Sequence, residues 1–109
     1  MASRSFSFAG FKRSFFNVEM HDGTKLVCKY PSKALFTRIM NYATDKNKDQ
    51  SASEAIDTID NLVTDILNSN MGGVHVDKQD IADNYDLEEK IGMINLYTQF
   101  LGDLTNNPN

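Results

Sequence analysis

The chain has 109 residues, 40% of them hydrophobic and 24% charged, which suits one soluble globular domain with a useful core. No apolar run approaches the ~20 residues of a membrane span, and the first residues lack the apolar stretch of a secretory signal. The single cysteine, Cys28, excludes an internal disulfide and is expected to be a small core residue in a reducing compartment.

The net charge of −4 hides a division between the two halves of the sequence. Residues 1–48 carry nine basic and three acidic residues, a balance of +6, whereas residues 49–109 carry two basic and twelve acidic residues, a balance of −10. Such asymmetry is typical of chains that contact nucleic acid or membrane, or that meet copies of themselves head to tail. The alternative is that the two halves fold against each other within one monomer.

Residues 1–14 are interpreted as an N-terminal arm, because five of the seven phenylalanines lie in the first sixteen residues. Phe6, Phe8 and Phe11 are separated by small or polar residues, and residues 5–9 alternate at the period of a strand. The arm is therefore expected either to add an edge strand or to remain mobile until a partner covers it.

Residues 15–30 predict a β-hairpin. A two-residue Asp-Gly loop would place the apolar residues of the two strands on opposite faces of the sheet. A three-residue loop over residues 21–23, with Gly23 in the left-handed conformation, pairs Val18 with Leu26 and brings both apolar sets to one face. We therefore predict the three-residue loop.

Two amphipathic helices are predicted next, over about residues 33–43 and 52–68, with a solvated polar loop between them. Ser32 caps the first helix, and Ser51 with Glu54 forms a capping box at the start of the second. The apolar residues of the second helix cover roughly 140° of its circumference, the ordinary width for one core face. Its acidic residues are expected mostly on the outer side: Glu54, Asp57, Asp60 and Asp65.

The glycines and asparagines of residues 68–73 end the second helix, since both residue types tolerate the left-handed conformation. Residues 74–76 are expected to be extended, and Asp77 then caps a brief helical turn over residues 78–83. The sequence thus predicts an α+β fold, mostly helical, in which an N-terminal hairpin packs with three main helices. The single domain covers residues 15–105, and residues 106–109 form a flexible tail.

The last helix, predicted over residues 87–104, begins with a capping box formed by Asp86 and Glu89. One apolar stripe consists of Leu87, Ile91, Ile94 and Leu101. A second stripe beside it consists of Met93, Leu96, Tyr97, Phe100 and Leu104. Together the stripes cover roughly 220° of the circumference, whereas a helix on one core needs somewhat over ~100°. The helix is therefore expected either to lie centrally in the core or to expose its second stripe as a docking surface.

Metal binding and catalysis are not expected. Asp77, Asp80, Asp83 and Asp86 recur every three residues, but they lack the alternate spacing, central glycine and terminal glutamate of an EF-hand loop. His21 and His75 have no cysteine or second histidine at ligand spacing. No nucleophile elbow or glycine-rich phosphate loop occurs. The sequence therefore predicts no catalytic, cofactor-binding or metal-binding residue.

Nucleic-acid binding is a weaker alternative, because Arg4, Lys12 and Arg13 interleave with the aromatic residues of the arm as in single-strand grooves. The sequence pI of about 5.0 argues against it, since the acidic half of the chain repels phosphate.

The order of these parts resembles the small tail assembly chaperones of long-tailed phages and prophages of Gram-positive bacteria. The resemblance covers about residues 15–104, through "VEMHDGTKLVCKYP", "AIDTIDNLVTDIL", "VDKQDIADNYD" and "EEKIGMINLYTQFLGDL". The Phe-rich arm departs from the family pattern. The alternatives are a structural head–tail connector or minor tail protein and, less favoured, a small nucleic-acid-binding regulator.

The resemblance implies a non-catalytic protein of the host bacterial cytoplasm that is absent from the mature virion. Such proteins bind the long helical tape-measure protein, keep it soluble and help to recruit the tail-tube protein. An apolar surface suits this task because it covers helical faces without strict sequence demand. The candidate partner-binding residues are Met93, Leu96, Tyr97, Phe100 and Leu104 of the last helix, and Phe6, Phe8 and Phe11 of the arm.

Overall fold

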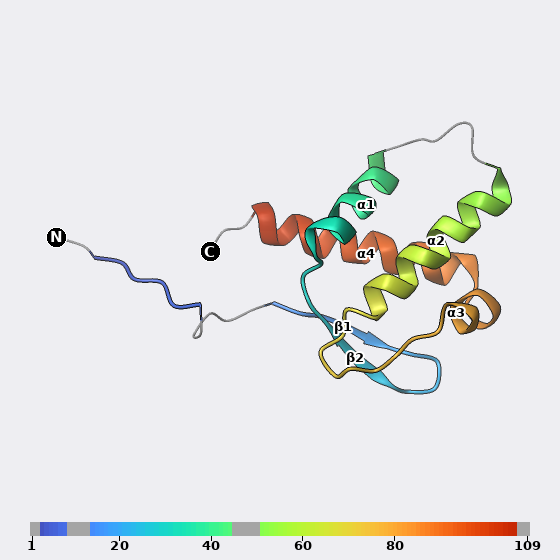
Figure 1. Cartoon of the computed structure of the whole chain (residues 1–109), viewed down its shortest axis with the longest axis horizontal. Helices are drawn as coiled ribbons and strands as arrows, with labels where there is room; N and C mark the ends of the chain where they lie inside the picture. The colour runs from blue at the N-terminus through green and yellow to red at the C-terminus, as the bar shows by residue number, and fades with distance from the viewer. Residues whose placement is uncertain (1–2, 9–13, 45–50, 107–109) are drawn as a thin grey trace.

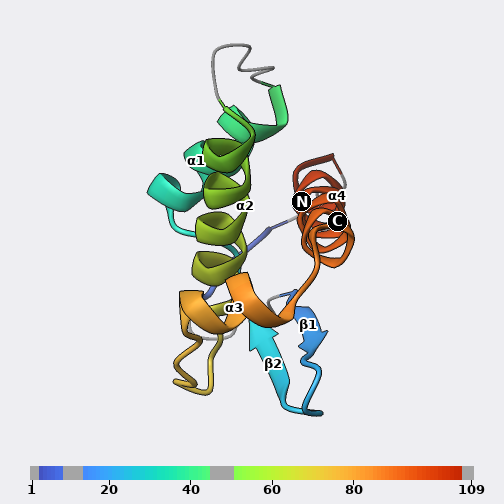
Figure 2. The ribbon, with the colours of Figure 1, turned by 90° about the vertical axis from the view of Figure 1, so that its right-hand side faces the viewer.

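The computed structural model describes residues 3–8, 14–44 and 51–106 and confirms the predicted α+β, mostly helical fold (Figure 1). Its elements are β1 (Phe16–Glu19), β2 (Lys25–Cys28), α1 (Lys33–Thr44), α2 (Ala52–Leu67), α3 (Lys78–Asn84) and α4 (Leu87–Asn106). Helix α2 lies between α1 and α4, and the hairpin lies at the end of α2 where the chain turns toward α3 (Figure 2).

The hairpin has the predicted register. Val18 pairs with Leu26 and Phe16 with Cys28, so the apolar residues of both strands share one face. Gly23 has a φ of 88°, which confirms the left-handed residue of the three-residue loop. Phe16, Leu26 and Cys28 are buried, and this face therefore closes one end of the core.

Each predicted helix start is confirmed by its cap. The capping side chains are Ser32, Ser51, Asp77 and Asp86, and Glu54 and Glu89 complete two capping boxes. These caps satisfy N–H groups that a helix leaves unpaired in its first turn. The brief turn predicted after Asp77 is the short helix α3.

Two asparagine side chains hold the segment between α2 and α3. The amide of Asn68 donates to the carbonyl oxygen of Val76 at 2.9 Å and accepts from its N–H at 2.7 Å. The amide of Asn70 makes the same pair of bonds with Val74, at 2.7 and 3.0 Å. Residues 74–76 lie in neither a helix nor a strand, and these side-chain amides take the place of a strand ladder.

Helix α2 is the central helix of the fold, because α1, α3, α4 and β2 all pack against it. Its buried residues cover roughly 200° of the circumference. The predicted arc was too narrow because two of the buried residues, Asp60 and Thr64, are polar. Asp60, expected on the outer side, is only 5% exposed, and its carboxylate accepts a hydrogen bond from the ammonium of Lys90 in α4 at 2.6 Å.

The buried line of α4 runs along the seam between its two predicted stripes. Ile94 and Leu101 of the first stripe and Tyr97 of the second are almost wholly inaccessible. The expectation that Tyr97 is exposed is therefore wrong. Its ring packs edge to face on Phe16, with the ring centroids 5.0 Å apart. Leu87 of the first stripe is 41% exposed, and it is the first residue of the helix.

The described part of the arm, residues 3–8, is extended and contains no strand (Figure 1). Phe6 is 62% and Phe8 is 83% exposed, and their rings meet edge to face with centroids 4.8 Å apart. The predictions for Phe11, for the polar loop at 45–50 and for residues 107–109 of the tail lie outside the described residues. Asn106, predicted as the first residue of the tail, is instead the last residue of α4. Within the described ranges, no helix is long and apolar enough to cross a membrane.

Candidate interaction surface

An apolar strip runs along α4 beside its buried line. We call it the α4 flank and define it as Met93, Leu96, Phe100 and Leu104. Leu96 is 56% exposed, and the other three residues are half-buried. The four side chains fall within roughly 80° of the helix circumference, so they form one continuous strip along about three turns. Met93 and Phe100 also pack against the core, so these two side chains of the flank are held in place.

The charges that α4 presents to solvent are all acidic. Glu88, Glu89 and Asp103 are exposed, whereas the one lysine of the helix, Lys90, is buried against Asp60. Asp103 lies one turn beyond Phe100 and on the same side of the helix, because residues three apart are neighbours on a helix surface. The α4 flank is therefore an apolar strip bordered by negative charge.

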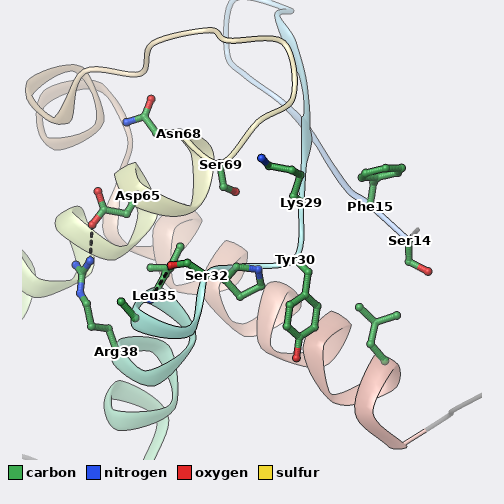
Figure 3. A pocket seen from close by; sticks show the side chains of 13 residues that line it. Ser14, Phe15, Lys29, Tyr30, Ser32, Leu35, Arg38, Asp65, Asn68 and Ser69 are labelled. Carbon is green, nitrogen blue, oxygen red and sulfur yellow. Dashed lines mark hydrogen bonds and ion pairs between the residues drawn. The ribbon is translucent and has the colours of Figure 1, made fainter. Parts of the chain in front are cut away.

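An open cleft of about 1030 Å³ adjoins the flank (Figure 3). It lies between the segment that enters α1 and the last turns of α2 and α4. Its apolar wall is formed by Phe15, Tyr30, Pro31, Leu35 and Leu104. Leu104 belongs to both the cleft and the flank, so the two form one continuous surface.

Several polar side chains of the cleft are paired within the protein. Arg38 donates to the carboxylate of Asp65 at 2.6 Å, and the hydroxyl of Ser69 donates to the main-chain oxygen of Ile66. Neither histidine nor the cysteine lines the cleft. Among the described residues, no group of three His, Cys, Asp or Glu side chains is placed to hold a metal ion. The arrangement suits recognition of an apolar partner by shape and contact.

A second cluster joins the hairpin to the start of α4. The ring of His21 stacks on Tyr85 with centroids 3.9 Å apart, and its Nε2 lies 2.6 Å from a carboxylate oxygen of Glu89. The hydrogen bonds from His21 and from the N–H of Asp86 lower the pKa of Glu89 below its usual value. A small cavity of about 150 Å³ lies beside this cluster, between the hairpin, α2, α3 and α4.

Sequence reasoning assigned His21 no role and missed its contacts. Its partners Tyr85 and Glu89 follow it by 64 and 68 positions. Neither a motif nor a periodicity relates such distant residues, so only the packing of the hairpin on α3 and α4 reveals the cluster.

The eight candidate partner-binding residues fall into four groups. Met93, Leu96, Phe100 and Leu104 lie together on the α4 flank, and Phe6 and Phe8 lie together on the arm. Tyr97 belongs to the core and is removed from the candidate surface. Phe11 lies outside the described residues.

Comparison with known protein families, curated proteins and solved structures gave no match. Fold and surface together define a small α+β protein whose last helix carries a partly exposed apolar flank.

Proposed function

We propose that the chain is a non-catalytic tail assembly chaperone of a long-tailed phage or prophage, which binds and solubilises the tape-measure protein during tail assembly. The observation that carries this proposal is the α4 flank: four large apolar side chains in a row, with Leu96 more than half exposed. The order of hairpin and helices, which resembles the chaperone family, supports it further.

The chemistry of the flank matches the task. A tape-measure chain is expected to expose long apolar helical faces before it enters the tail. Such a face packs into a groove or along a strip through side chains spaced three and four apart. Met93 adds an unbranched side chain that adapts to irregular partners. The adjoining cleft lengthens the apolar surface through Leu104.

The test is co-expression with the tape-measure protein encoded by the same genome. The readout is the fraction of tape-measure protein that remains in the supernatant after centrifugation. We expect the natural chain to keep it in solution and Leu96→Arg to return most of it to the pellet, because a charged side chain interrupts the flank. Leu87→Arg is the matched control, since Leu87 is an exposed leucine on another side of the same helix.

The two variants share their change in size and charge, so equal loss of solubility would contradict a role for the flank. Circular dichroism of both variants verifies that α4 is intact. Mass spectrometry of purified particles provides a second test. The chaperone proposal expects no copies of the chain there, whereas stoichiometric amounts would favour a structural head–tail or minor tail protein.

A further inference from the structure

We propose that, in the free protein, the N-terminal arm of one copy docks on the α4 flank of a second copy. The occupant is thus another molecule of this chain, bound through the aromatic and basic residues of its arm. This goes beyond the proposed function, because it concerns the chain alone and is tested without a tape-measure protein.

The arm has an unusual combination of features for a segment in water. Two aromatic side chains, Phe6 and Phe8, are each more than half exposed. Residues 1–14 also carry three basic residues and no acidic residue, a charge of +3. A partner surface for the arm therefore needs apolar area for the rings and negative charge nearby.

The α4 flank has the complementary combination. Leu96 and the half-buried residues beside it supply apolar area, and Asp103 lies next to them. Residues 86–106 carry four acidic residues and one lysine, a charge of −3, and that lysine, Lys90, is buried. The arm and the flank thus match in apolar character and are opposite in charge, as expected for two surfaces that associate.

The geometry favours a second copy over the same chain. Residues 3–8 of the arm extend past the end of the folded body in Figure 1. The exposed rings of Phe6 and Phe8 are therefore accessible to a second molecule.

The size of the contact sets its strength. Two phenylalanine side chains bury about 150–250 Å² each, whereas stable complexes bury about 1,200–2,000 Å² in total. We therefore expect a weak association that increases with protein concentration.

A mixing experiment tests both the contact and its intermolecular nature. Ser5→Cys is labelled with a nitroxide and mixed with a ¹⁵N-labelled natural chain that carries no nitroxide. Cys28 is wholly buried, and burial raises the pKa of its thiol, so the label attaches selectively at position 5.

We expect loss of amide signals at residues 93–104 of the ¹⁵N-labelled chain, and a greater loss at higher concentration. No loss in the mixture would overturn the proposal. A loss confined to other surfaces, such as the cleft, or one seen only when both labels are on the same chain, would overturn it as well.

Charge reversal tests the pairing directly, with the apparent dissociation constant from sedimentation as the readout. An exposed ion pair contributes little free energy to binding, so we expect Arg4→Glu and Asp103→Arg each to raise this constant about 2- to 5-fold. The double variant should restore it. Glu88→Arg makes the same charge change on another side of α4 and should have little effect. Failure of the double variant to recover, or an equal effect of Glu88→Arg, contradicts the proposal.

Discussion

Tyr97 is buried although it carries a polar group, because its hydroxyl donates to the main-chain oxygen of Lys29 at 2.9 Å. Burial also raises the pKa of this hydroxyl above its usual range. Tyr97→Ala is expected to lower the free energy of unfolding by about 3–5 kcal/mol, as for other large buried side chains. Tyr97→Phe should cost about 1 kcal/mol, the net value of one hydrogen bond. Denaturant unfolding measures both.

Leu96→Ala is the control for this prediction, since exposed substitutions usually change stability by no more than about 0.5 kcal/mol. A loss at Tyr97→Ala no larger than that at Leu96→Ala would place Tyr97 outside the core. It would then return Tyr97 to the candidate docking surface.

Glu89 makes stability depend on pH through its hydrogen bonds with His21 and Asp86. These bonds favour the ionised carboxylate in the folded state, so the folded pKa lies below the usual value of 4.5. Their contribution is complete above pH 4.5 and is lost as the pH falls through the lower folded pKa. When the pH is lowered from 7 to below 4.5, we expect the free energy of unfolding to fall less for Glu89→Gln than for the natural chain.

The measurement is thermal or denaturant unfolding of the two proteins at both pH values. Glu88→Gln removes the same charge from the neighbouring position and is the matched control. If Glu89→Gln and the natural chain lose stability in parallel, the contact with His21 contributes nothing in solution.

At the scale of elements, one buried ion pair fastens α4 to α2. Asp60 and Lys90 are each about 5% exposed. Lys90→Met should lower the free energy of unfolding by about 3–5 kcal/mol, because it leaves an uncompensated carboxylate in the core. The double variant Asp60→Leu with Lys90→Met should recover to within about 1 kcal/mol of the natural chain or exceed it.

A double-mutant cycle by denaturant unfolding checks this pair. Thr64 donates to the main-chain oxygen of Asp60, so its hydroxyl keeps its partner in every member of the cycle. Additive losses from the two single substitutions, without recovery in the double variant, would show that the two charges are not coupled.

Local features of the fold followed from the sequence. The hairpin register depended on where Val18 and Leu26 fall in the alternation, and the helix starts depended on Ser51 and Asp86. The central role of α2 did not follow from the sequence. Asp60 was expected on the outer side because its partner lies thirty positions away, so part of the buried face of α2 was not recognised. The buried line of α4, on which Tyr97 lies, also depends on contacts between residues far apart in the sequence, so the sequence did not locate it.

At the scale of the whole molecule, the division of charge is partly resolved within the monomer. Two described contacts join the basic half to the acidic half: the ion pair of Arg38 with Asp65 and the hydrogen bond between His21 and Glu89. Two further described ion pairs, including the buried pair, lie within the acidic half. The halves therefore fold against each other in part, and the basic arm carries charge beyond these contacts.

Salt should distinguish the forces that bring two copies together. If the arm and the flank attract by charge, association of the full chain should weaken between low salt and about 1 M salt, where surface charges are screened. Light scattering over a concentration series measures this, with Phe8→Ser as the variant that removes the aromatic contact. Association that strengthens with salt would leave apolar contact as its sole cause.

The central position of α2 also determines how slowly its amide hydrogens exchange with water. Amide hydrogens exchange with water through local opening where few contacts hold an element, and only through global unfolding where many do. The amides near Leu62 and Ile66, enclosed by α1, α3, α4 and the hairpin, should therefore be the last to take up deuterium. A partner could then occupy the outer flank of α4 and leave again while this slowest-exchanging part of the protein never opens.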